Sequence, residues 1–395
     1  MSTFEPPVSR RPAPAPRRRR GPQRGRVSPR TRLRRILTAA ALVALLPALI
    51  SYVSTIAEPS NSTWGIRSVE WLRDHGAAGI VTKIESIYYS LNEPSKGGPG
   101  LRALPRTGLK GGARAPGTAT VVERPARIAP LLSPSLPGEG EWNSIRGSES
   151  SSNPPLLVTT FRTDPEYPRL VAGVAWINPS RSEVSLVPGR LEPSVELPAR
   201  GPLEVPASAR SRLLATFNSG FKLADSHGGW AKNGHTYAPM QQGEATFVRY
   251  ADGHYDVAAW HGGPRVPASV VFARQNLPLI VEEGKLNPNL SDGPEWGATL
   301  GNAVRVWRSA LGVDRHGNLL YVAANEQTVS SLAKILQHAG AVRAMELDIN
   351  SYWISFNTYG APGALHPSKL LSETERSASR YLTPDDRDFF AVYER

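Results

Sequence analysis

The sequence contains no cysteine. Disulfide bonds, thiolate metal sites and a cysteine nucleophile are therefore excluded, and packing alone has to stabilise the fold. The 395 residues also lack a Walker-type phosphate loop, a Gly-x-Ser-x-Gly nucleophile elbow in a strand-to-helix setting, and a His-x-x-x-His zinc helix. These absences argue against phosphate-loop NTPases, serine hydrolases of the α/β type and zinc proteases.

The net positive charge is concentrated at one end of the chain. Residues 1–35 contain twelve arginines, no lysine and one acid, Glu5, which accounts for nearly all of the chain's net charge of +12. Such an arm can bind nucleic acid or anionic lipid, but its place directly before an apolar run is typical of a cytoplasmic flank. We predict a disordered cytoplasmic arm and expect no nucleic-acid partner, although a main role for the arm itself stays open as an alternative.

Residues 36–57 form a run of 22 residues without a charge. A helix of this length crosses a hydrocarbon core of about 30 Å, so the run predicts a single-pass membrane helix with the bilayer as its partner. The N-terminus is then cytoplasmic and the rest of the chain is extracytoplasmic. A cleaved signal peptide is the alternative, since residues 55–57 resemble a cleavage site, but the apolar run exceeds the usual length of roughly 7–15 residues.

The remaining chain divides into three predicted parts. Residues 58–91 read as a juxtamembrane helical segment, because apolar residues recur there at helical spacing. Residues 92–154 are rich in Pro, Gly, Arg and Ser and predict an extended linker. Residues 155–395 predict a folded domain of the α/β (α+β) class with a β-rich mixed sheet. The strands expected in it are 156–161, 170–177, 184–187, 213–217, 245–250, 255–260, 269–272, 279–281, 310–313 and 319–323, with a closing strand at 389–393.

The clearest unit of the domain is a strand, helix and strand. After the strand at 319–323, Thr328 is placed to cap a helix that ends at Gly340. Residues 344–350 then alternate between apolar and polar side chains, as a strand does. This order predicts a parallel crossover.

Three polar side chains of the last strand share one face: Glu346, Asp348 and Asn350. Two carboxyl groups on one face can divide acid and base roles, or ligate a hard cation such as calcium or magnesium. No cofactor is required by the pattern. A strand with one solvated face would carry the same spacing, so spacing alone leaves both interpretations open.

Further candidates lie in turns. Asn218 and Lys222 flank a glycine turn after an apolar strand and can aim an amide and an ammonium into a cleft. Arg308 can grip a phosphate with its planar fork, although such arginines are more often ion-pair partners. His235 lies in a glycine-flanked loop and is a candidate acid or base, although lone loop histidines are mostly solvated.

Three segments taken together resemble the phosphodiester glycosidase family. They are Ala-Thr-Phe-Asn-Ser-Gly-Phe at 215–221, Arg-Ser-Ala-Leu-Gly-Val-Asp-Arg-His-Gly at 308–317, and Ala-Met-Glu-Leu-Asp at 344–348. The resemblance covers roughly 155–360 and implies a hydrolase that cleaves sugar-1-phosphodiesters, here in a sugar-phosphate polymer or glycan of the cell envelope. It also implies that Asn218, Arg308 and Asp348 occupy motif positions, with the anchor and linker of an actinobacterial membrane-bound type.

The sequence departs from the family where glycines usually follow the aspartate. Ile349 and Asn350 stand there, and Ser219 replaces another glycine. Side chains at such positions occupy space that close approach of a ligand to the backbone requires. Two interpretations follow: an envelope hydrolase with a different substrate, in which Asp348, Glu346 and Arg308 are catalytic and Asn218, Lys222, His235 and Asn350 bind the substrate, or a non-catalytic carbohydrate-binding or scaffolding protein on the same fold.

Overall fold

The computed structural model describes residues 28–105, 107, 124–145, 153–291, 293–297 and 305–395. The chain divides into two compact units, Met1–Glu58 and Pro59–Arg395. In the first, helix α1 (Pro29–Ala57) contains the predicted apolar run and is long and apolar enough to cross a membrane. Residues 1–27 of the predicted arm lie outside the described residues.

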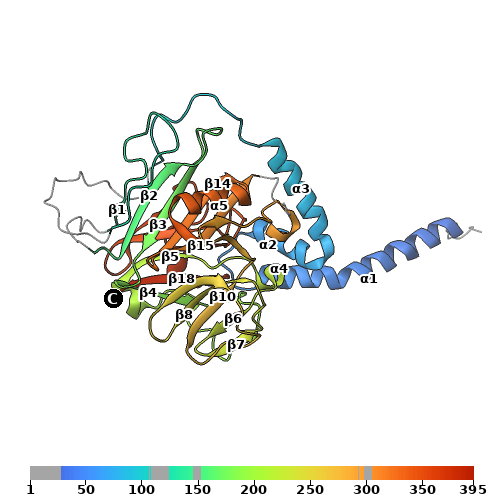
Figure 1. Cartoon of the computed structure of the whole chain (residues 1–395). Coiled ribbons are helices and arrows are strands. Elements are labelled where there is room, and N and C mark those ends of the chain that lie inside the picture. The colour runs from blue at the N-terminus through green and yellow to red at the C-terminus, as the bar shows by residue number, and fades with distance from the viewer. Residues whose placement is uncertain (1–27, 106, 108–123, 146–152, 292, 298–304) are drawn as a thin grey trace, which may run out of the picture. The chain divides into compact units, whose positions relative to one another are not determined.

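The second unit begins with a helical pair, α2 (Trp64–Leu72) and α3 (Ala78–Leu91), which a short π-helical turn, η1 (Arg73–Ala77), connects. The helical character predicted for this segment is therefore confirmed. Figure 1 shows the three elements in sequence on one side of the β-rich body.

Three antiparallel sheets form the body of the second unit (Figure 1). In sheet order, the eight-stranded sheet consists of β1 (Asn143–Ser144), β2 (Leu156–Arg162), β3 (Val171–Ile177), β14 (Leu319–Gln327), β13 (Val306–Asp314), β15 (Ala341–Glu346), β11 (Leu279–Glu282) and β12 (Lys285–Leu286). One five-stranded sheet consists of β7 (His235–Ala238), β6 (Trp230–Lys232), β10 (Val270–Gln275), β8 (Ala245–Tyr250) and β9 (Tyr255–Ala259). The other consists of β17 (Leu365–Lys369), β16 (Phe356–Ala361), β5 (Leu213–Asn218), β18 (Phe389–Glu394) and β4 (Ser182–Val187).

Helices are few in this body, as predicted. Beside α5 (Val329–His338) there is one short helix, α4 (Leu223–Ser226), in the described part. The 3-10 turns are η2 (Ala207–Arg212), η3 (Gly293–Trp296) and η4 (Arg380–Leu382). The fold class is the β-rich α+β arrangement expected from the sequence, although every hydrogen-bonded strand pair among the described residues is antiparallel.

The predicted strand, helix and strand is present as β14, α5 and β15. Thr328 caps α5 by accepting a hydrogen bond from Ser331 N at 3.1 Å. Both β14 and β15 pair antiparallel with β13, so the two run parallel with one strand between them. β15 ends at Glu346 rather than at Asn350, and backbone hydrogen bonds to Ser309 of β13 continue only as far as Asp348.

Part of the predicted linker belongs to the folded body. Residues 124–145 are described, and β1 pairs with β2. Glu139 is fully buried and forms an ion pair with Arg162 at 2.8 Å, which the Pro/Gly-rich composition of this stretch does not reveal. Turn-rich composition predicts irregular backbone but does not exclude burial.

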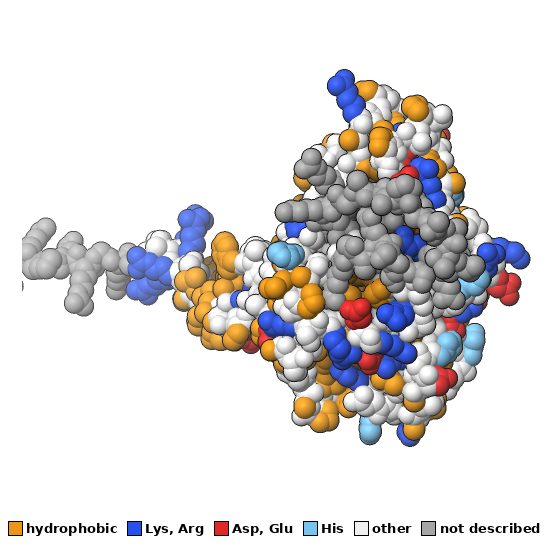
Figure 2. Space-filling model, turned by 90° about the vertical axis from the view of Figure 1, so that its left-hand side faces the viewer, with side chains coloured by type: hydrophobic (Ala, Val, Ile, Leu, Met, Phe, Trp, Pro, Cys, Tyr) orange, Lys and Arg blue, Asp and Glu red, His pale blue; other side chains and the backbone are white. Residues whose placement is uncertain are grey.

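Strand β18 is the closing strand predicted at the C-terminus, and it lies at the centre of the core. The ring of Phe390 is 5.1 Å from that of Phe217, 4.9 Å from Phe247 and 5.6 Å from Phe272, so it joins two of the sheets. This packing fixes the charged turn that immediately precedes β18. On the face in Figure 2, basic and acidic side chains are interspersed, as expected for a body near neutrality.

Candidate active site

A glycine turn carries the chain out of β5. Gly220 has a φ of +133°, and a Cβ there would overlap the side-chain amide of Asn276. That amide accepts a hydrogen bond from Phe221 N at 3.0 Å and donates one to Ser219 O at 3.1 Å. The glycine is therefore required for close approach. The turn positions Lys222 at the start of α4.

Asp348 lies just beyond the end of β15. Its carbonyl accepts a hydrogen bond from Ser309 N at 2.9 Å, and Leu347 N donates to Ser309 O at 2.8 Å, so the backbone stays fixed to β13. The Asp348 side chain is almost fully buried, and its Oδ1 accepts a hydrogen bond from Asn350 N at 3.0 Å. Its position is thus set by rigid elements rather than by a free loop.

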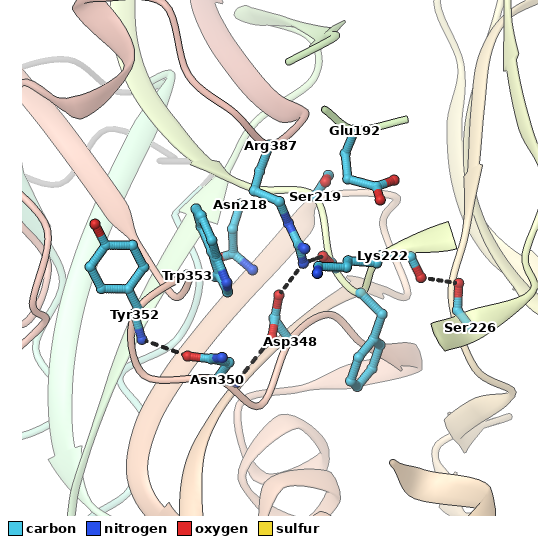
Figure 3. A network of polar contacts seen from close by, with 12 residues as sticks. Glu192, Asn218, Ser219, Lys222, Ser226, Asp348, Asn350, Tyr352, Trp353 and Arg387 are labelled. Carbon is cyan, nitrogen blue, oxygen red and sulfur yellow. Dashed lines mark hydrogen bonds and ion pairs between the residues drawn. The ribbon is translucent and has the colours of Figure 1, made fainter. Parts of the chain in front are cut away.

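Arg387, in the turn before β18, faces Asp348. Its Nη2 donates to Asp348 Oδ2 at 3.2 Å and to Gly220 O at 3.3 Å. The guanidinium lies 4.9 Å from the ring centroid of Trp353. Figure 3 shows Arg387 pointing at Asp348, with Trp353 on one side and Lys222 on the other. Among the described atoms, Nη1 of Arg387 is buried and has no hydrogen-bond partner, so it can donate to a bound ligand.

The electrostatics of Asp348 suit proton transfer. Burial raises the pKa of Asp348, and the Arg387 guanidinium lowers it in part, with a net shift above the ordinary value. A carboxylate with a raised pKa is a stronger base once ionised and a usable acid when protonated. Raised values of this kind are typical of functional sites, although structural ion pairs produce them too.

A carboxylate from the juxtamembrane segment occupies this site. Glu70 of α2 accepts a hydrogen bond from Trp353 Nε1 at 3.3 Å and lies 2.8 Å from Lys222 Nζ. Burial raises the pKa of Glu70, but Lys222 and Arg387 more than offset this, and its pKa falls below the ordinary value. Glu70 is therefore charged: Lys222 and Trp353 contact its carboxylate, and Arg387, which pairs with Asp348, attracts it.

Polar contacts fasten the start of the juxtamembrane segment to the turn before β18. Ser62 Oγ donates to Asp386 Oδ2 at 2.7 Å, and Asn61 Nδ2 donates to Asp385 Oδ2, also at 2.7 Å. Asp385 is in turn held by Arg380 at 2.7 Å. The segment that carries Glu70 and the turn that carries Arg387 are thus positioned together.

Two of the predicted catalytic residues lie in the core. Arg308 and Glu346 form an ion pair at 2.6 Å, and neither side chain has exposed surface. Arg308 Nε also donates to Gln327 O at 2.8 Å, and burial raises the pKa of Glu346 against the influence of Arg308. In this arrangement the pair supports β13 and β15 from within, and no surface of Arg308 is available for a substrate phosphate.

Asn218 likewise connects buried elements. Its Nδ2 donates to Ser309 Oγ at 3.0 Å, and its Oδ1 accepts from Tyr321 OH at 2.9 Å and from Ser355 N at 3.2 Å. Its amide is therefore used within the fold. His235 is exposed on β7, in a different sheet, and its Nδ1 lies 3.0 Å from Asn233 O.

The structure thus brings Lys222, Asp348 and Asn350 together from the predicted set, and it adds residues that sequence reasoning missed. Arg387 stands in a run of four charged residues, 385–388, directly before an apolar strand, which was a usable signal for a buried charged turn. Glu70 carried no comparable signal, because nothing in a helical pattern links it to a distant domain.

The residues that replace the family's glycines pack beside the site. Ile349 joins a small apolar cluster with Phe221 and Val306. Asn350 Oδ1 accepts a hydrogen bond from Tyr352 N at 3.0 Å, which closes a turn. Ser219 Oγ donates to Asp388 Oδ1 at 2.6 Å. Across the described ranges, no group of three or more His, Asp or Glu residues is placed to hold a metal ion.

Comparison with known families supports the sequence resemblance. Residues 212–348 match the family model described as phosphodiester glycosidase. The resemblance is therefore confirmed over this segment, which includes Lys222 and Asp348 and ends before Arg387. No curated protein sequence matches the chain.

Two solved structures are similar in outline. One is the catalytic domain of zebrafish N-acetylglucosamine-1-phosphodiester alpha-N-acetylglucosaminidase, auto-inhibited by its pro-peptide, with 18% identity, coverage of 65% of this chain and 88% of that chain, and a TM-score of 0.39. The other is a hypothetical protein from Synechocystis, with 14% identity, coverage of 61% and 62%, and a TM-score of 0.36.

Proposed function

We propose that this chain is a membrane-anchored hydrolase of the phosphodiester glycosidase type that cleaves a sugar-1-phosphodiester of a cell-envelope glycopolymer. The observation that carries the proposal is the anion site: Lys222 forms an ion pair with the Glu70 carboxylate, and Arg387, which contacts the buried Asp348, attracts the same carboxylate. The match of residues 212–348 to the phosphodiester glycosidase family model supports this reaction class.

The anion site suits the leaving group of this reaction. In the proposed complex the substrate phosphate replaces the Glu70 carboxylate and contacts Lys222 Nζ and the unpartnered Nη1 of Arg387. Fixed cations in a partly buried site stabilise negative charge more than water does. As the bond between C1 of the sugar and the phosphate oxygen breaks, that charge grows on the phosphate, and both cations stabilise it.

Asp348 supplies the base in this scheme. Ionised Asp348 accepts a proton from the attacking water, whose oxygen forms the new bond to C1, and the phosphate monoester departs with the electrons of the broken bond. A phosphate leaves readily, so a strong general acid is not needed. The site accordingly needs no histidine near the leaving group.

Location at the membrane is part of the proposal. Helix α1 meets the length and apolarity of a span, and the arginines before it favour a cytoplasmic N-terminus. The second unit would then be extracytoplasmic, on the side where wall polymers lie. Protease access to the arginine-rich arm and to the body, measured in sealed vesicles of known orientation, tests this topology.

Release of free sugar tests the activity. Full-length protein in nanodiscs is incubated with synthetic sugar-1-phosphate methyl diesters and with purified wall polymer, with and without EDTA. We expect release that Asp348→Asn abolishes and that Asp256→Asn leaves unchanged, because Asp256 forms a surface ion pair with Arg343. Loss of release in EDTA would add a metal to the scheme. Polymer binding without release from any substrate would refute the hydrolase and favour the carbohydrate-binding alternative.

A further inference from the structure

Helix α3 exposes an apolar face. Five side chains at helical spacing form this face, each more than half exposed: Ile80 at 67%, Ile84 at 63%, Ile87 at 53%, Tyr88 at 62% and Leu91 at 81%. Positions separated by three, four and seven residues lie on the same side of a helix, so the five make one continuous stripe. Figure 1 shows α3 at the periphery of the second unit.

The inward side of α3 is the more polar one. Thr82, Glu85 and Ser86 are partly buried there, and Glu85 forms an ion pair with Arg73 at 2.5 Å. Tyr89 on this side packs against the apolar cluster that contains Ile349. A helix on the surface of a water-soluble protein has the opposite arrangement, with its apolar side inward. The exposed stripe therefore calls for an apolar surrounding other than the protein's own core.

The position of α3 in the chain indicates what that surrounding is. Residues 58–63 alone separate the candidate span α1 from α2, and α3 follows after one short turn. A segment tethered this closely to a membrane helix meets the bilayer surface at a high effective concentration. Trp64, at the start of α2, is 67% exposed, and tryptophan is enriched at the membrane–water interface.

We propose that the stripe of α3 lies in the outer boundary of the bilayer, between lipid headgroups and acyl chains. An interfacial helix lies in the membrane plane with its apolar side buried and its charged side chains extended to the water. Exposed Lys83, beside the stripe, extends its ammonium group to the headgroups. The inference rests on α1 spanning the membrane but is independent of catalysis.

The absence of cysteine makes a direct test simple, because each introduced cysteine is the single labelling site of the full-length protein. Ile84→Cys and Leu91→Cys are labelled with an environment-sensitive fluorophore and reconstituted into phosphatidylcholine–phosphatidylglycerol liposomes. Leu365→Cys on β17, an exposed leucine of the body at 58%, is the matched control. Leu45→Cys, within α1, reports separately on the span.

We expect a blue-shifted emission at positions 84 and 91, quenching by nitroxide-labelled lipid and protection from aqueous iodide. The label at position 365 should show no blue shift, no quenching by nitroxide-labelled lipid, and ready quenching by iodide. The proposal is overturned if position 84 is as accessible to iodide as position 365. A blue shift at 84 without quenching by lipid nitroxide also overturns it, since that result means that protein covers the stripe. Lack of lipid quenching at position 45 would instead show that α1 does not span the membrane. Failure of this premise is therefore distinguishable from failure of the proposal for α3.

Discussion

Replacing Glu70 by glutamine should free the anion site. The Glu70 carboxylate lies 2.8 Å from Lys222 Nζ, and the two side chains are only 16% and 18% exposed. Any phosphate that binds to Lys222 and Arg387 has to displace this carboxylate first. The binding-competent state is therefore only a fraction of the population, and the apparent dissociation constant of the ligand equals the intrinsic constant divided by that fraction.

The size of the effect follows from the geometry. The pair at 2.8 Å has a Coulomb energy of about 6 kcal/mol at an effective dielectric constant of about 20, which is an upper limit. Net values for hydrogen bonds to charged groups are about 1.5–3 kcal/mol, and the glutamine amide keeps part of the contact. We therefore expect Glu70→Gln to lower the apparent dissociation constant by about tenfold, which corresponds to about 1.4 kcal/mol.

Isothermal titration of the full-length protein in nanodiscs with a sugar-1-phosphate methyl diester measures this constant. Glu85→Gln is the control, because Glu85 forms an ion pair with Arg73 in the same segment and does not contact Lys222. An affinity of Glu70→Gln that equals or falls below that of Glu85→Gln would refute the reasoning, since it would show that Glu70 does not compete with the ligand.

Three further predictions concern the turn, the guanidinium and a remote carboxyl. Arg387→Gln should reduce kcat/KM by about 10²–10³ and move the ascending limb of its pH profile to higher pH, because Arg387 lowers the pKa of Asp348; an unshifted limb would argue against Asp348 as the base. Gly220→Ala should destabilise the fold by about 2–5 kcal/mol in urea unfolding, and more than Gly243→Ala, whose Cβ meets open space; equal losses would contradict the close approach. Burial, with Glu295, raises the pKa of Glu244 to about 7, so the stability that its protonated form contributes is lost as pH rises from the ordinary value of 4.5 to about 7. After discounting for solvent, Glu244→Gln should be more stable than wild type by about 1–2 kcal/mol at pH 8.5, with little difference at pH 5, in urea unfolding; the same gain at both values would contradict this titration.

Local pattern predicted most of the strands and the helix from Thr328 to Gly340, because alternation and capping are properties of neighbouring residues. The pattern of neighbouring residues does not predict the order of the strands in each sheet. β18, from the end of the chain, lies between β4 and β5, and this long-range pairing is what brings Arg387 to Asp348. Side-chain roles are harder to predict than strands for the same reason. The sequence presents Glu346 and Arg308 as site residues, whereas in the structure they form a buried ion pair with each other.

The glycine replacements do not by themselves favour a binding module over an enzyme. Ile349 turns its side chain into the cluster with Phe221, and Asn350 is engaged with the backbone of Tyr352, so neither fills the anion site. Glu70 is what occupies that position in the described structure. A ligand can displace the Glu70 carboxylate and then reach Asp348. Side chains at the former glycine positions could not be displaced in this way if they filled the site. The comparison of Glu70→Gln with Asp348→Asn therefore separates the two interpretations: a hydrolase gains ligand affinity in the first and loses turnover in the second, while a binding module shows only the first effect.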